Sequence, residues 1–230
     1  MNFKKAFWVS DIHGCYDEFI LMLKHWNPKE QLLVLGGDYI DRGQRSYDVL
    51  DVVQRLVYDN NGQVIALRGN HENLMIEAQE TNNHELWVLN GGNKTLESIE
   101  HSVPIVLKEM VRFSKATELY YEFGNVLFVH AGVTRGVKRL DEMAEFDFTW
   151  NRDHYKTNNL TGKTIIFGHT PTRTIHNDTK NDDIWISKDG SRIAADGACV
   201  FGGQLNGLVV DLDGNILEKH VIKKVGEKDE

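Results

Sequence analysis

The sequence predicts an α/β domain built on mixed sheets, and three observations support this class. Over the first part of the chain, short apolar runs typical of buried strands alternate with segments whose apolar residues recur at helical spacing. That order is typical of parallel strands joined by right-handed crossovers. The second half contains two pairs of strand-like segments separated by tight turns, which indicates hairpins and therefore antiparallel pairing. Parallel and antiparallel pairs in one chain give mixed sheets.

The first half supplies three predicted strands and the helices that connect them. The strands are expected at residues 6–10, 31–36 and 64–67, because each is a short apolar run. A third helix is expected near residues 72–78. The first two helices are predicted from apolar residues at helical spacing, which are Tyr16, Phe19, Ile20, Leu23 and Trp26 in one and Tyr47, Leu50, Val53 and Val57 in the other.

The second half is richer in strands. A hairpin is expected from residues 120–123 and 126–129, and a second one from residues 208–212 and 215–217. The turn between the latter two segments is Asp-Gly, which is a strong hairpin signal. Residues 164–167 form a further apolar run and are expected to be a buried strand.

Composition places the chain among globular proteins. It has 230 residues, of which 41% are hydrophobic and 26% are charged, with no repeat and no linker-like stretch. We therefore expect one domain over residues 1–230, with residues 73–120 as a helical, insertion-like lobe. Two cysteines, Cys15 and Cys199, do not make a disulfide framework, and both are expected to pack in the interior.

The net charge of −8 argues against non-specific binding to nucleic acid, whose phosphates such a surface repels. The chain has no apolar run of about 18 residues that could cross a membrane, and its first residues are not expected to act as a signal peptide. The expected location is the cytoplasm, with no membrane partner.

Five predicted strands end in polar residues that lie beside glycines. In open α/β sheets, ligands bind at the carboxyl ends of strands, so these side chains are expected to converge. Each motif alone has a simpler explanation: an Asp-x-His pair is mostly incidental, and a single histidine after a strand usually packs in the core. Together these explanations fail, because burying so many polar groups without partners is costly. The residues are Asp11, His13, Asp38, Asp41, Asn70, His71, His130 and His169.

Carboxylate and imidazole together favour manganese, iron or zinc over calcium. Asp11 and His13 are expected on one ion, and the two oxygens of Asp38 would bridge it to a second. Asn70, His130 and His169 would complete that second site. Two ions roughly 3.5–4 Å apart activate one bridging water and hold a phosphoryl oxygen during in-line displacement.

The remaining residues suggest acid catalysis and phosphate binding. His71 follows Asn70 directly and would protonate the leaving oxygen, and Asp41 would orient its imidazole. Arg42 would present its planar guanidinium to the phosphate, although an Asp-Arg pair alone is more often a surface ion pair. The tryptophans Trp8, Trp26, Trp87 and Trp185 are expected only to pack.

These motifs resemble those of the binuclear metallophosphoesterases of the phosphoprotein phosphatase type. The small phage and bacterial Ser/Thr/Tyr protein phosphatases are the most similar branch, and the symmetrical diadenosine tetraphosphatases are related to it. Further similarity is carried by residues 150–152 and 195–205. The family patterns G-D-x-H-G, G-D-x-V-D-R-G, G-N-H-E, H-A-G and G-H-T correspond here to residues 10–14, 37–43, 69–72, 130–132 and 168–170.

The resemblance implies a fold and a cofactor. The fold is a central β-sandwich of mixed sheets flanked by helices, the calcineurin-like metallophosphoesterase fold. The cofactor is a pair of divalent ions, with manganese as the first choice and iron, zinc or nickel as alternatives. Two departures are present: Ser10 replaces a glycine, and the acid at Asp196 is shifted by one position, so no role is assigned to Asp196.

The resemblance also implies roles for individual residues. It implies His71 as the acid, paired with Asp41. It groups His169 with Asp11 and His13 rather than with the second ion. The full implied set is Asp11, His13 and His169 on one ion, Asp38 bridging, Asn70 and His130 on the other, and Arg42, Arg152 and Arg68 near the phosphate.

The predicted function is a metal-dependent phosphoprotein phosphatase acting on phosphoserine and phosphothreonine, with phosphotyrosine as a further substrate. The alternative is a symmetrical bis(5'-nucleosyl)-tetraphosphatase or another nucleoside polyphosphate hydrolase. The core motifs leave this choice open, because both reactions need the same cations around phosphorus. The expected partner is a phosphorylated protein, peptide or small molecule. A non-catalytic phosphate-binding module is disfavoured, because no expected ligand and no acid is missing.

Overall fold

The computed structural model describes residues 3–60, 62–99, 105–134, 136 and 139–225. The first of its two sheets has the strand order β10-β9-β1-β2-β3. β1, β2 and β3 are parallel, whereas β9 is antiparallel to both β1 and β10. The strands are β1 (Lys5–Val9), β2 (Gln31–Leu35), β3 (Val64–Ala66), β9 (Gln204–Asp211) and β10 (Ile216–Lys223).

The second sheet has the order β4-β5-β6-β8-β7 and is also mixed. β5, β6 and β8 are parallel, and an antiparallel strand flanks them on each side. The strands are β4 (Tyr120–Phe123), β5 (Val126–Val129), β6 (Thr164–Phe167), β7 (Trp185–Ile186) and β8 (Arg192–Ala194). The predicted α/β class with mixed sheets is confirmed, as are both hairpins. β7 and β8 were not expected, because two and three residues carry no readable periodicity.

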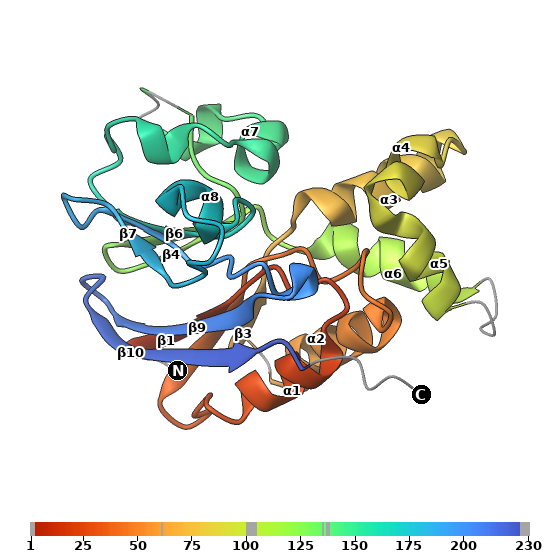
Figure 1. The fold of residues 1–230 in the computed structure, drawn as a ribbon, viewed down its shortest axis with the longest axis horizontal. Coiled ribbons are helices and arrows are strands. Elements are labelled where there is room, and N and C mark those ends of the chain that lie inside the picture. Colours follow the sequence, from red (N-terminus) through yellow and green to blue (C-terminus); the bar gives the residue numbers. More distant parts are fainter. Residues whose placement is uncertain (1–2, 61, 100–104, 135, 137–138, 226–230) are drawn as a thin grey trace.

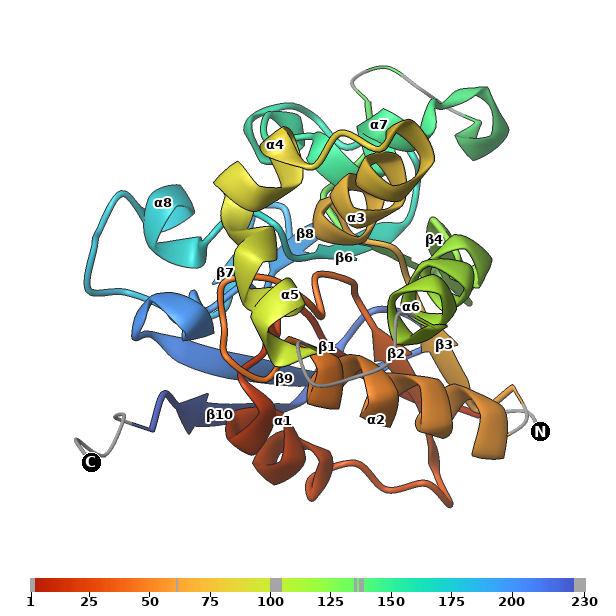
Figure 2. The ribbon, with the colours of Figure 1, turned by 90° about the vertical axis from the view of Figure 1, so that its right-hand side faces the viewer.

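The helices lie outside the two sheets and beside them (Figure 1). Helices α1 (Tyr16–Leu23) and α2 (Ser46–Asp59) lie against the first sheet, and α7 (Glu145–Trp150) and α8 (Thr172–His176) lie against the second. The remaining helices form a group on one side, visible in yellow and green in Figures 1 and 2. This group contains α3 (Asn70–Thr81), α4 (Glu85–Trp87), the π-helical turn Val88–Gly92, α5 (Asn93–Ser98) and α6 (Ile105–Ala116).

Side chains alternate between the two faces of each strand, so that one face of the sheet packs against helices and the other against the second sheet. In β1, Phe7 and Val9 pack with residues of α1 and α2, whereas Ala6 and Trp8 face the second sheet. The Trp8 ring stacks on Phe128 of β5 with 5.4 Å between ring centroids. The central β-sandwich flanked by helices is therefore confirmed.

One helix is shorter than expected. The apolar spacing extends to Trp26, but α1 ends at Leu23. Trp26 instead lies in the loop that follows, where its indole N–H donates to the carbonyl of Gln31 at 3.1 Å. Among the helices of the described residues, none combines the length and the apolar character that crossing a bilayer requires.

Candidate functional site

The loops that follow β1, β2, β3, β5, β6 and β8 meet in one place. The backbone N–H of His169, after β6, donates to the Asp11 carboxylate, after β1, at 2.8 Å. The Nδ1–H of His130, after β5, donates to the carbonyl of Gly36, after β2, at 2.7 Å. Parallel strands put their carboxyl ends at the same edge of a sheet, and the stacked sheets bring the two edges together.

Asp38 lies at the centre of these loops. Its Oδ2 atom is 3.4 Å from Nε2 of His13 and 3.4 Å from Nε2 of His130. Its Oδ1 atom accepts the backbone N–H of His71 at 3.0 Å. Asp38 is 2% exposed, so these histidines screen its charge in place of solvent.

Two groups of potential ligand atoms share Asp38. One group is His13, Asp38 and His71, and the other is Asp38, His130 and His169; the atoms of each group lie within 4.8 Å of one another. His169 thus has ligand atoms near those of His130, while its backbone N–H donates to Asp11 and it lines the same cavity as Asp11 and His13. Which of the two ions His169 would hold therefore stays a prediction. Asn70 joins the second group, because its Oδ1 is 3.2 Å from Nε2 of His130.

The carbonyl partners of two histidines set their tautomers. His13 donates from Nδ1 to the carbonyl of Ile40 at 2.8 Å, and His130 donates from Nδ1 to Gly36. In both rings Nε2 is the atom that remains to face Asp38. Metal-binding histidines are commonly oriented in this way by a carbonyl acceptor.

Three buried polar atoms of the site have no hydrogen-bond partner within the described part of the chain. They are Asp11 Oδ2, His71 Nε2 and His169 Nε2. Buried polar atoms are nearly always paired, so each such atom needs an explanation. A divalent cation would give Asp11 and His169 their partner, and the mixture of carboxylate, imidazole and amide ligands suits manganese, iron or zinc. The residues present therefore fit a pair of divalent ions.

The pKa shifts of the buried charged residues also fit a cation site. Burial raises the pKa of Asp11 to about 6. Burial also opposes the charge of Asp38, but His130 and His71 outweigh it and hold the pKa of Asp38 well below its usual range. Burial lowers the pKa of His130, yet the Asp38 charge raises it to about 9. His130 and Asp38 thus each favour the charged form of the other, and a cation bound at Nε2 of His130 would take the place of its proton.

Backbone strain is concentrated at these residues. A positive φ is uncommon for residues other than glycine, and such strain is often stored at functional sites. Two glycines are needed because the ligands pass so close: a Cβ at Gly69 would collide with the Asp38 carboxylate, and one at Gly168 with that of Asp11. The strained site residues, with φ from 45° to 72°, are Asp11, His13, Asp38, Asp41, Arg42 and His169.

Asp41 and His71 form a buried pair. The His71 Nδ1–H donates to Asp41 Oδ2 at 2.7 Å, so Nε2 of His71 stays free. Two further donors bind Asp41: the Trp87 indole N–H, which is 3.0 Å from each carboxylate oxygen, and the Thr95 hydroxyl at 2.6 Å. Trp87 is therefore more than the packing residue expected, and Thr95 was not expected at all. Nothing in the local pattern of either residue indicates a carboxylate 46 or 54 positions away.

The arginines divide into two groups. Arg42 and Arg152 line a cavity of about 190 Å³ together with Asp11, His13 and His169. Arg42 donates to Nε2 of His13 at 2.6 Å, and Arg152 donates to the carbonyl of His169 at 3.2 Å.

Arg68 has a different position from the one expected. Its guanidinium donates to the carbonyls of Lys115 at 2.7 Å and Thr117 at 3.2 Å, and it pairs with Glu145 at 3.1 Å. It thereby links α6 to α7, and it is absent from the described residues that line the 190 Å³ cavity.

Asp196, to which the sequence assigned no role, lies in the cavity wall beside Phe201. Burial, together with the charge of Asp11, raises the pKa of Asp196 to about 7. Glu72 was also missed: its carboxylate accepts the backbone N–H groups of Asp38, Tyr39 and Gly69 at 2.8–2.9 Å and so links the second and third loops.

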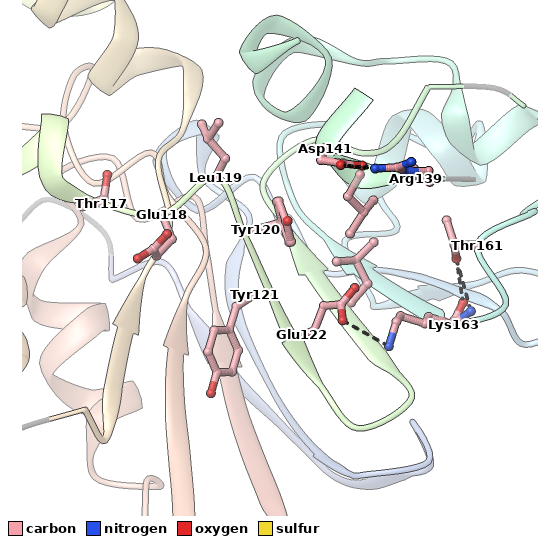
Figure 3. A pocket seen from close by; sticks show the side chains of 12 residues that line it. Thr117, Glu118, Leu119, Tyr120, Tyr121, Glu122, Arg139, Asp141, Thr161 and Lys163 are labelled. Carbon is pink, nitrogen blue, oxygen red and sulfur yellow. Dashed lines mark hydrogen bonds and ion pairs between the residues drawn. The ribbon is translucent and has the colours of Figure 1, made fainter. Parts of the chain in front are cut away.

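A wider cavity of about 800 Å³ runs along the edge strand β4 and shares no described lining residue with the first (Figure 3). Its wall mixes apolar and charged side chains, and Figure 3 shows Glu122 turned toward Lys163, whose Nζ lies 3.5 Å from the carboxylate. None of its described lining residues is a predicted site residue.

Similarity to known proteins agrees with this geometry. Residues 5–203 match the family model described as calcineurin-like phosphoesterase. The chain is 27% identical to serine/threonine-protein phosphatase 1 of Salmonella typhimurium, over 75% of this chain and 81% of that protein. It is also 27% identical to an asymmetrical bis(5'-nucleosyl)-tetraphosphatase of Bacillus velezensis, over 86% of each.

Solved structures support the fold. A protein serine/threonine phosphatase from Saccharomyces cerevisiae superimposes with a TM-score of 0.71 at 14% identity, covering all of this chain and 82% of the other. A cold-active protein tyrosine phosphatase gives a TM-score of 0.62 at 20% identity, covering 94% of this chain and 78% of the other. With the family match spanning most of its length, the chain belongs to the calcineurin-like phosphoesterases, hydrolases that use a divalent metal centre.

Proposed function

We propose that this protein is a phosphoprotein phosphatase that hydrolyses phosphoserine and phosphothreonine with the help of two divalent ions. The observation that carries the proposal is Asp38, a single buried carboxylate shared by two groups of ligand atoms. A shared carboxylate is what a pair of adjacent ions requires. Asp11, His13 and Asp38 would hold one ion, and Asp38, Asn70, His130 and His169 the other.

When bound, the two ions would supply charge to stabilise the phosphoryl oxygens and would activate water, with manganese as the first choice. The protein's own residues provide the remaining functions. Arg42 and Arg152, which line the cavity beside the cluster, would bind the phosphate oxygens. In its protonated form, His71 would give the proton on Nε2 to the leaving oxygen, and Asp41, which accepts the Nδ1–H, would orient the ring and stabilise its positive charge.

The size of the cavity favours a phosphorylated side chain. At about 190 Å³ it is smaller than the roughly 300–1,000 Å³ that enclosed small-molecule sites occupy. It would accept a phosphoryl group and leave the rest of the substrate outside, which suits a phosphoserine on a protein surface.

A second candidate is the hydrolysis of dinucleoside polyphosphates, asymmetrical or symmetrical. Phe201 favours it, because its ring is 58% exposed and lies at the cavity wall, with the Arg42 guanidinium 5.3 Å from the ring centroid. An exposed aromatic ring at this position would stack on a base.

Rates on matched substrates would separate the two candidates. We expect the manganese-loaded chain to show a higher kcat/KM on a phosphoserine peptide than on diadenosine tetraphosphate. A large preference for the dinucleotide would overturn the first proposal, and the products would then distinguish symmetrical from asymmetrical cleavage. Absence of turnover on both substrates, with two ions bound per chain, would contradict both candidates.

A further inference from the structure

The two cysteines of the chain lie next to each other behind the candidate metal site. Cys15 immediately precedes α1, and Cys199 begins the 3-10 turn Cys199–Phe201. Both are buried, at 2% and 1% exposure. Their sulfur atoms and a carboxylate oxygen of Glu18 all lie within 4.8 Å of one another. Residues more than 180 positions apart in the sequence thus present facing thiols.

We propose that Cys15 and Cys199 are a reversible disulfide pair, oxidised by hydrogen peroxide or a similar small peroxide. The inference is independent of the substrate proposed above. It assigns a covalent modification to residues that the hydrolysis does not use, and it connects that modification to the position of the phosphate-binding arginine.

A metal site is the main alternative, and the neighbours of Glu18 argue against it. Oε1 of Glu18 already pairs with the Lys224 ammonium at 3.1 Å and accepts the backbone N–H of Val225 at 2.9 Å. With its charge neutralised, Glu18 is a poor third ligand. Two sulfurs alone fall short of the four ligands of a structural zinc site.

Both cysteines border cavities that a small oxidant can enter. Cys15 lines a cavity of about 490 Å³, and Cys199 lines the 190 Å³ cavity beside the candidate metal site. Each thiol is therefore next to space that a peroxide molecule can enter, although neither is exposed on the surface.

The chemistry balances in two steps. The thiolate of one cysteine attacks a peroxide oxygen, which breaks the O–O bond, forms a sulfenic acid and releases hydroxide. The second thiolate then attacks the sulfenic sulfur, which forms the S–S bond and releases hydroxide. With the two thiol protons, the products are one disulfide and two waters; the cysteines are oxidised by two electrons and the peroxide is reduced.

Formation of the bond would move the wall of the site. A disulfide needs about 2.05 Å between its sulfurs, so the two segments must approach each other. The segment that carries Cys199 also carries Phe201, which lies against Arg42. Ala198, directly before Cys199, has a positive φ of 53°, which is uncommon for a residue with a side chain, so the turn that carries Cys199 is already in a strained conformation. Because misplacement by about 1 Å can cost 10²-fold in rate, we expect oxidation to lower phosphatase activity at least about tenfold.

Mass spectrometry tests the bond without relying on activity. The full-length metal-free chain is treated with hydrogen peroxide, and its intact mass and non-reduced tryptic peptides are measured. We expect a loss of two hydrogens and a cross-linked peptide that contains Cys15 and Cys199, both reversed by dithiothreitol. A chain that gains oxygen on single cysteines, forms only intermolecular disulfides, or retains zinc through both thiols would overturn the proposal.

Activity of the manganese-loaded protein then tests the consequence. The oxidised wild-type chain should regain its activity with dithiothreitol, and Cys199→Ala should be insensitive to the same treatment. Cys15→Ala is the matched variant and should behave identically. If the disulfide forms but activity is unchanged, the proposed link to Arg42 is wrong. If the wild type is inactive on every phosphate ester yet forms the bond, the proposed function fails and the disulfide pair stands.

Discussion

Replacing His71 by asparagine tests the assignment of the general acid. Asparagine removes the imidazole proton that the leaving oxygen would receive. The Asp41 carboxylate keeps the Trp87 and Thr95 donors, so the variant should fold with a loss of about 1.5–3 kcal/mol for the missing charged hydrogen bond. General acid catalysis contributes roughly 10²–10⁴ in rate, so kcat should fall by that factor, or about 3–5 kcal/mol in activation free energy.

The choice of substrate makes this prediction sharper. p-Nitrophenolate leaves readily without a proton, whereas the alkoxide of serine does not. The loss of activity in His71→Asn should therefore be large on a phosphoserine peptide and much smaller on p-nitrophenyl phosphate. Steady-state kinetics on both substrates, with His25→Asn as a control at an exposed histidine outside the site, measure the difference.

Metal content decides between an acid and a ligand. His71 shares a group of ligand atoms with His13 and Asp38, so it must be tested as a ligand as well. Elemental analysis of His71→Asn should find as much manganese per chain as in the wild type. Loss of one ion would refute the assigned role, and so would equal rate losses on the two substrates.

Three further changes probe neighbouring contacts. Arg42→Ala should raise KM and lower kcat at unchanged metal content; unaltered kinetics would remove Arg42 from the phosphate site. Trp87→Phe removes one donor from Asp41 and should cost about 1.5–3 kcal/mol in urea unfolding, together with a lower kcat; equal stability would mean that the bond contributes nothing. Burial lowers the pKa of His154 to about 3 in the folded chain. As the pH falls below about 6.5, the unfolded chain therefore binds a proton at His154 before the folded chain does. The free energy of unfolding should be lower by about 2 kcal/mol at pH 5 than at neutral pH. His154→Asn should show less of that fall, and an identical pH profile would contradict the cause.

The sequence was most informative where a polar residue that can bind a ligand follows a recognisable apolar strand. Asp11, Asp38 and His130 each lie within three residues of the end of a strand, so the strand places them near the sheet edge. The apolar pattern and the crossover rules predict that the strands run parallel. Parallel strands bring the loops at their carboxyl ends to the same edge of the sheet. The parallel strands, both hairpins and the meeting of these loops were therefore predictable, while the catalytic and metal-binding roles of the residues stay predictions.

The tertiary structure decided which side chains face one another. Trp87 and Thr95 reach Asp41 because the helical group folds back over the second loop, and neither residue carries a local signal of that contact. Arg68 turns to α6 and α7 although it precedes a glycine as His13 and Arg42 do, because two carbonyls there accept its donors. The pairing of Cys15 with Cys199 and of His169 with His130 depends on how the two sheets pack. The sequence alone determined the α/β class with mixed sheets and the residues gathered at one edge, since strand periodicity and glycine placement are local properties, and its motifs supplied the family resemblance that implied the sandwich. Contacts across that edge depend on distances of a few ångströms between distant segments, which only the packed molecule sets.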